Sequence, residues 1–167
     1  MTARRYVEEI ELGDGGPGRL VDLLRRFAAC HDGWANLQPL LPEGADLPPS
    51  RGLAILFGAP PVTVPVCTWV AGRPTRRGLR PDALGIQHAS GPRAVNRLAS
   101  AGLPLLPGWR WRQDNPRRGL VVDLPAGTDP GEAVMWLLSA GTRLCALELD
   151  GRWRARVHHP RQAAPGG

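Results

Sequence analysis

Arginine and tryptophan alternate along two stretches of this chain. The first is residues 109–112, Trp-Arg-Trp-Arg, and the second is residues 152–157, Arg-Trp-Arg-Ala-Arg-Val. Successive side chains of a β-strand point to opposite faces, so each stretch would carry arginine on one face and apolar side chains on the other. Guanidinium groups bind phosphate in a bidentate manner, and a basic strand face can follow a nucleic-acid backbone. The alternation therefore predicts a sheet face that binds a polyanion, with nucleic acid as the expected partner.

The predicted phosphate contacts come from both stretches and from an arginine-rich loop at residues 72–81. Arginine at these positions could also serve a purely structural role, in either of two ways. Outward-facing arginine on an edge strand prevents sheets from pairing edge to edge, and a solvated basic face has the same composition as a binding face. The predicted contacts are Arg76, Arg77, Arg110, Arg112, Arg152, Arg154 and Arg156.

Charge is unevenly distributed along the 167 residues, whose net charge is +6. Residues 1–50 hold five Arg and eight acidic residues, whereas residues 51–167 hold sixteen Arg and seven acidic residues. This division favours an acidic partner such as nucleic acid. The chain has no Lys, however, and its 21 Gly and 18 Pro are typical of a high-GC bacterial genome. Part of the arginine therefore stands where other proteins carry lysine on a solvated surface.

A second candidate site is the turn from His88 to Arg93, which lies between an expected strand and an expected helix. Free N–H groups at the start of a helix attract anions, and His88, Ser90 and Arg93 could bind one together with them. Gly91 would let a ligand approach the backbone. The pattern predicts, as an alternative function, a small ligand-binding or catalytic domain. It matches no phosphate-loop motif, and a Ser90 that only caps the helix accounts for the same residues.

No group of residues in the sequence has the spacing of a catalytic or metal site. Cys30 and His31 are adjacent, and adjacent side chains on a helix point apart rather than forming a thiolate pair. The remaining histidines and cysteines do not follow a zinc-binding spacing. We therefore expect neither a cofactor nor a metal, assign no catalytic residue, and favour a binding protein over an enzyme.

Protein interaction is a further alternative. The acidic residues of the N-terminal segment could cover the basic face or dock a partner protein. Trp34, Trp69 and Trp136 are either core residues or interface anchors, and a small chain needs large apolar side chains in its core. An exposed surface containing these tryptophans would favour a subunit of a protein complex.

The elements that would position these residues follow a β-α-β-β-α-β order over residues 84–149. Short apolar runs predict the strands, and Ser90 and Asp129 precede periodic apolar segments typical of helices. This order resembles the ferredoxin-like α+β fold, with one extra strand at the C-terminus. The expected strands are residues 84–88, 109–113, 120–124, 144–149 and 153–157.

An internal repeat supports two similar halves in this region. Residues 94–102 agree with residues 133–141 at six of nine positions. A ferredoxin-like domain contains two βαβ halves, so a duplicated half would leave two similar helices.

Three regions are expected along the chain: an acidic helical segment at 1–50, an α+β domain at 51–160 and a flexible tail at 161–167. Apolar residues at helical spacing predict a helix over residues 19–30, in a segment that packs on the rest of the chain. Two β-rich runs between residues 52 and 70 predict a hairpin at the start of the second region.

Cysteine usage and hydropathy predict a cytoplasmic protein. Cys30, Cys67 and Cys145 are scattered and odd in number, unlike the dense, even set of a secreted scaffold. The N-terminal residues include acids and lack the apolar core of a signal peptide. No apolar run is long enough to span a bilayer, so no membrane association is expected.

Overall fold

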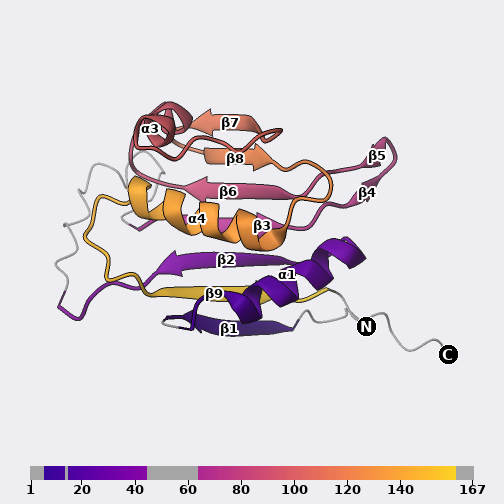
Figure 1. Ribbon diagram of the computed structural model, residues 1–167, viewed down its shortest axis with the longest axis horizontal. Coiled ribbons are helices and arrows are strands. Elements are labelled where there is room, and N and C mark those ends of the chain that lie inside the picture. The colour runs from indigo at the N-terminus through magenta and orange to yellow at the C-terminus, as the bar shows by residue number, and fades with distance from the viewer. Residues whose placement is uncertain (1–5, 14, 45–63, 161–167) are drawn as a thin grey trace, which may run out of the picture.

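The computed structural model describes residues 6–13, 15–44 and 64–160. Seven of its strands form one antiparallel sheet in the order β1-β9-β2-β3-β6-β8-β7 (Figure 1). Helices and a large sheet together confirm the predicted α+β class. In chain order the strands of this sheet are β1 (Val7–Leu12), β2 (Trp34–Pro39), β3 (Val66–Val70), β6 (Ala83–Gln87), β7 (Arg110–Asn115), β8 (Gly119–Asp123) and β9 (Trp153–His158).

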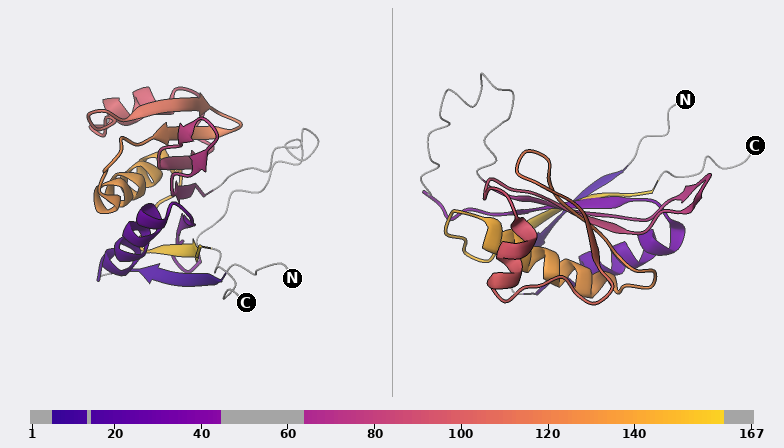
Figure 2. Two further views of the ribbon diagram at one scale, coloured as in Figure 1. Left: turned by 90° about the vertical axis from the view of Figure 1, so that its right-hand side faces the viewer. Right: turned by 90° about the horizontal axis from the view of Figure 1, so that it is seen from above.

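The helices of the described fold lie on one face of the sheet (Figure 2). They are α1 (Gly18–Cys30), α3 (Ala94–Ser100) and α4 (Pro130–Leu144). The apolar side of α1 is buried, as the spacing of its leucines predicts. Helix α4 begins after Asp129, whose carboxylate accepts a hydrogen bond from the Glu132 N–H, so the predicted cap is confirmed. No described helix covers the opposite face, which we call the open face.

Alternation along the strands separates the covered face from the open face. On β3, Cys67 and Trp69 are fully buried, whereas Thr68 and Val70 are only partly buried. On β9, the three apolar residues are buried and the arginines are exposed, which confirms the predicted split of residues 152–157. For residues 109–112 the predicted split is only partly confirmed, because Trp109 is buried but Trp111 is 57% exposed on the edge strand β7. The register also shifts between Trp111 and Gln113.

Strand order differs from the predicted ferredoxin-like arrangement. The strand expected at residues 144–149 is wrong, because α4 continues to a buried Leu144 and the chain then bends. The extra C-terminal strand that was expected is β9, and it lies between β1 and β2. Strands β2 and β3 separate β9 from β6. The N-terminal segment at 1–50, for which the sequence predicts a helix alone, thus contributes β1 and β2 to the same sheet.

The other expected elements are found near their predicted bounds or fall outside the described residues. Strands β6, β7, β8 and β9 and helix α1 occupy the expected places. Helix α3 begins only at Ala94, after Arg93, so Ser90 does not cap it as predicted. The run at 52–57 and the tail at 161–167 lie outside the described residues. The basic loop at 72–81 contains a short hairpin, β4 (Pro74–Thr75) and β5 (Gly78–Leu79).

In the described part of the chain, none of the helices combines the length and the apolar character that crossing a bilayer requires.

Candidate functional site

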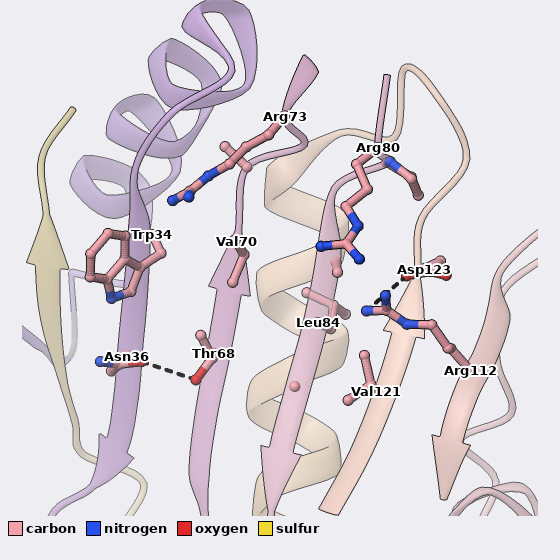
Figure 3. A pocket seen from close by; sticks show the side chains of 14 residues that line it. Trp34, Asn36, Thr68, Val70, Arg73, Arg80, Leu84, Arg112, Val121 and Asp123 are labelled. Atoms are coloured by element: carbon pink, nitrogen blue, oxygen red, sulfur yellow. Dashed lines mark hydrogen bonds and ion pairs between the residues drawn. The ribbon is translucent and has the colours of Figure 1, made fainter. Parts of the chain in front are cut away.

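A hollow of about 530 Å³ lies on the open face, over strands β2, β3, β6 and β8. Figure 3 shows Trp34 on one side of it and Arg112 on the other, with Arg73 and Arg80 at one end. The lining is mainly apolar between these side chains. The volume falls within the range of small-molecule sites in proteins, roughly 300–1,000 Å³.

The depth of the hollow comes from a row of small residues across the middle of the sheet. Asn36 on β2, Thr68 on β3, Gly85 on β6 and Val121 on β8 are cross-strand neighbours. Gly85 contributes no side chain, and a Cβ built there would approach only the Thr68 Cβ, at 3.8 Å. The open space above Gly85 is therefore bordered by the taller side chains of neighbouring strands.

Polar and aromatic side chains on β2 and β3 form one wall of the hollow. The Thr68 hydroxyl donates to Asn36 Oδ1 at 3.0 Å, so its remaining lone pairs can accept a further hydrogen bond. The Trp34 indole stacks on the His158 ring, with centroids 4.5 Å apart and an interplanar angle of 12°. This stacking holds the indole upright against the sheet beside the hollow.

The β4–β5 hairpin brings two arginines to the end of the hollow. The Arg80 N–H donates to the Arg73 carbonyl at 2.8 Å, which joins the two legs of the hairpin. Gly72 makes this close approach possible, because a Cβ there would lie 2.3 Å from the Arg80 carbonyl oxygen. The Gly72 N–H also donates to Asp82 Oδ1 at 2.6 Å. The bases of both arginines are therefore held by the backbone.

The arginines predicted to bind phosphate fall into two groups on the fold. Arg110 and Arg112 are on the edge strand β7, and Arg76 and Arg77 are in the hairpin that precedes β6. The other group consists of Arg154 and Arg156 on β9 and Arg152 just before it, and it lies on the far side of β2 and β3. We call it the β9 group, or the β9 arginines. The structure therefore divides the predicted arginines into two groups.

The three arginines of the β9 group each have a carboxylate partner. Arg154 lies 3.2 Å from Glu11, and Arg156 lies 2.8 Å from Glu9. The hydrogen bond from Arg156 holds the pKa of the Glu9 carboxyl below its usual range. Arg152 likewise lies 2.7 Å from Asp150. The charges of this group are partly neutralised within the chain.

The arginines of the hairpin loop and of β7 form fewer ion pairs with carboxylates than the β9 group does. Arg112 lies 3.4 Å from Asp123, and Arg73 lies 3.6 Å from Asp32. Within residues 6–13, 15–44 and 64–160, no ion pair involves Arg76, Arg77, Arg80 or Arg110. We call these six arginines the hollow-side group; its members are Arg73, Arg76, Arg77, Arg80, Arg110 and Arg112.

No protein-family model matches this chain, and no curated protein or solved structure does.

In the part of the chain that the structure describes, no three His, Cys, Asp or Glu side chains could jointly hold a metal ion. The Cys67 thiol is fully buried, which raises its pKa and keeps it protonated. The open face carries both exposed arginines and a hollow.

The turn from His88 to Arg93 is tightly occupied by its own side chains. His88 is only 3% exposed, and its Nδ1 lies 2.8 Å from the Ser90 hydroxyl. Burial, with the nearby Arg97 charge, lowers the pKa of His88. The first N–H groups of α3, at Ala94 and Val95, donate to the carboxylate of Asp114. A carboxylate of the chain therefore already holds the N–H groups predicted to bind an anion.

Replacing Asp114 with alanine is expected to destabilise the fold. The two hydrogen bonds from α3 measure 3.1 and 3.0 Å, and loss of a helix N-terminal acceptor costs about 1–2 kcal/mol. The free energy of unfolding, measured by urea denaturation, tests this. Asp114→Asn keeps one acceptor oxygen and should lose about half as much; equal stability of all three proteins would contradict the role of Asp114.

Two of the three tryptophans considered as interface anchors are core residues. Trp69 is fully buried, and Trp136 is 4% exposed, with its Nε1 donating to the Pro104 carbonyl at 2.9 Å. Trp34 alone of the three lies on the open face, beside the hollow. The sequence points to Trp34 as a possible interface anchor. It cannot show that β2 and β8 line the same hollow, because the two strands are far apart in the chain.

Proposed function

We propose that this protein binds nucleic acid on the open face of its sheet, through the hollow-side arginines. The observation that carries the proposal is the position of these arginines relative to a hollow on a sheet face that no described helix covers. Arg73, Arg80 and Arg112 line the hollow, and the other three belong to the β4–β5 hairpin loop and to β7, the elements that also supply these lining arginines. Phosphodiesters are the abundant ligands that match several arginines spread along a surface. The net charge of +6 favours encounter with such a polyanion.

The β9 arginines are assigned a smaller share of the binding. A phosphate would have to displace Glu9, Glu11 or Asp150 from them before it gained a full contact. The hollow-side arginines without a described ion pair carry no such cost. Exposed ion pairs contribute only about 0–1 kcal/mol, so Arg73 and Arg112 can exchange their partners for a phosphate at little expense.

The test compares two triple variants that remove the same charge. Labelled single- and double-stranded DNA and RNA are titrated with each protein at two salt concentrations, and binding is followed by fluorescence anisotropy. Arg76→Ala/Arg77→Ala/Arg110→Ala should weaken binding to every sequence. For a single strand it should flatten the slope of log K against log salt by about 2, since each lost contact removes about 0.7. Arg152→Ala/Arg154→Ala/Arg156→Ala is the control and should bind nearly as the parent does.

Two results would contradict the proposal. Absence of binding to any of the four nucleic acids at low salt would remove nucleic acid as the ligand. Equal weakening by the two triple variants would show that net charge, rather than the hollow-side group, determines the affinity.

A further inference from the structure

We propose that the nucleic acid bound by this protein is single-stranded, and that one unstacked base sits in the hollow over Gly85. This inference rests on the proposed function and adds to it the form of the ligand. It follows from a feature that phosphate binding alone does not need: an apolar depression between the arginines.

Gly85 is the first line of evidence. It lies inside β6, paired on both sides by β3 and β8. Glycine weakens the interior of a strand, and there it commonly marks a place where a ligand approaches the backbone closely. The space above Gly85 is open, since a Cβ would make only one ordinary contact, at 3.8 Å with Thr68. A side chain would fit at this position, so packing of the fold does not explain the glycine. The lack of a side chain at Gly85 leaves the hollow open.

The lining of the hollow matches the two kinds of surface on a base. The partly buried side chains of Val70 and Val121 supply apolar surface against which the face of a flat ring can be buried. Thr68 offers lone pairs to the polar edge of the ring. Arg80 and Arg112 stand at the border, where the phosphates on either side of an inserted base would lie.

A duplex fits this surface less well than a single strand. Its bases are stacked and paired, so it offers a protein phosphates and groove edges. A duplex would therefore contact the arginines and leave the hollow empty. A single strand can turn one base onto the protein while its backbone follows the arginines.

The experiment fills the hollow without changing any charge. Gly85→Val extends a side chain into the open space, and valine favours a strand more than glycine does. The folded protein should therefore keep or gain stability in thermal denaturation. Its affinity for a labelled single-stranded oligonucleotide should fall about tenfold, which corresponds to about 1.4 kcal/mol of lost apolar burial. Its affinity for a duplex of the same length should not change.

Gln87→Val is the matched control. Gln87 lies on the same strand and points to the same face, two residues beyond Gly85, and it is exposed outside the hollow. This variant should bind single strands as the parent does. If the parent binds single strand and duplex equally and Gly85→Val weakens neither, the inference is overturned while nucleic-acid binding stands. If the parent binds no nucleic acid, the proposed function itself fails.

Discussion

Replacing Trp69 with alanine is expected to lower the free energy of unfolding by about 3–5 kcal/mol. Trp69 is fully buried on β3, the middle strand of the sheet. Its neighbours in register are Ala35 and Leu84, both of which are also buried. Because the small Ala35 side chain cannot fill the space left by an indole, the substitution leaves a cavity under the helices.

The measurement is urea denaturation followed by circular dichroism, with Trp34→Ala as the control. Trp34 is on the adjacent strand but on the open face, where it is only partly buried. Its loss should destabilise the protein much less, because solvent can occupy the vacated space. Trp69→Phe keeps most of the ring volume and should fall between the parent and Trp69→Ala. Similar losses for Trp69→Ala and Trp34→Ala would contradict the division of the sheet into a covered and an open face.

Gly141→Ala is expected to destabilise the protein by about 1–3 kcal/mol, the cost of overpacking a core. On an exposed helix the same change stabilises by about 1 kcal/mol, because alanine favours the helix. At Gly141 a Cβ would lie 2.7 Å from Cys67 Sγ and 2.7 Å from Trp153 Cη2. Both residues are buried on the sheet beneath α4, so the helix has to move away from the sheet.

A double variant identifies the cause of this loss. Adding Cys67→Ala removes one of the two close contacts, so it should recover part of the stability that Gly141→Ala loses, as measured by urea denaturation. Ser139→Ala on the same helix is the control and should leave the free energy of unfolding nearly unchanged. A Gly141→Ala protein as stable as the parent would show that α4 does not approach the sheet this closely.

The sequence predicts the individual elements better than their arrangement. Strand alternation and helix periodicity depend on neighbouring residues, so the β9 split and the Asp129 cap could be recognised without the fold. The place of β9 could not, because β9 pairs with two strands from a distant part of the chain, β1 and β2. Local pattern also favours a strand at 144–149, but Leu144 is buried as the last residue of α4, so the helix continues into the expected strand.

The candidate site shows the same limit. Arginine type and alternation point to Arg110 and Arg112, and the structure brings both to the open face near the hollow. The pairing of Arg154 and Arg156 with Glu11 and Glu9 depends on the register between the first and last strands, which no local pattern shows. The hollow depends on Gly85, whose neighbours across the sheet come from distant parts of the chain.

The position of β9 has a consequence for folding during synthesis. Strands β1 and β2 are made before the other described strands of the sheet, yet the strand that separates them, β9, is made after all of these. Until residues 153–158 leave the ribosome, β1 has no described partner strand and one edge of β2 stays open. Long-range pairing of this kind slows folding, and unpaired strand edges promote aggregation. A chain truncated before β9 would therefore keep β2, β3, β6, β8 and β7 paired but expose the edge of β2 that β9 covers in the full chain.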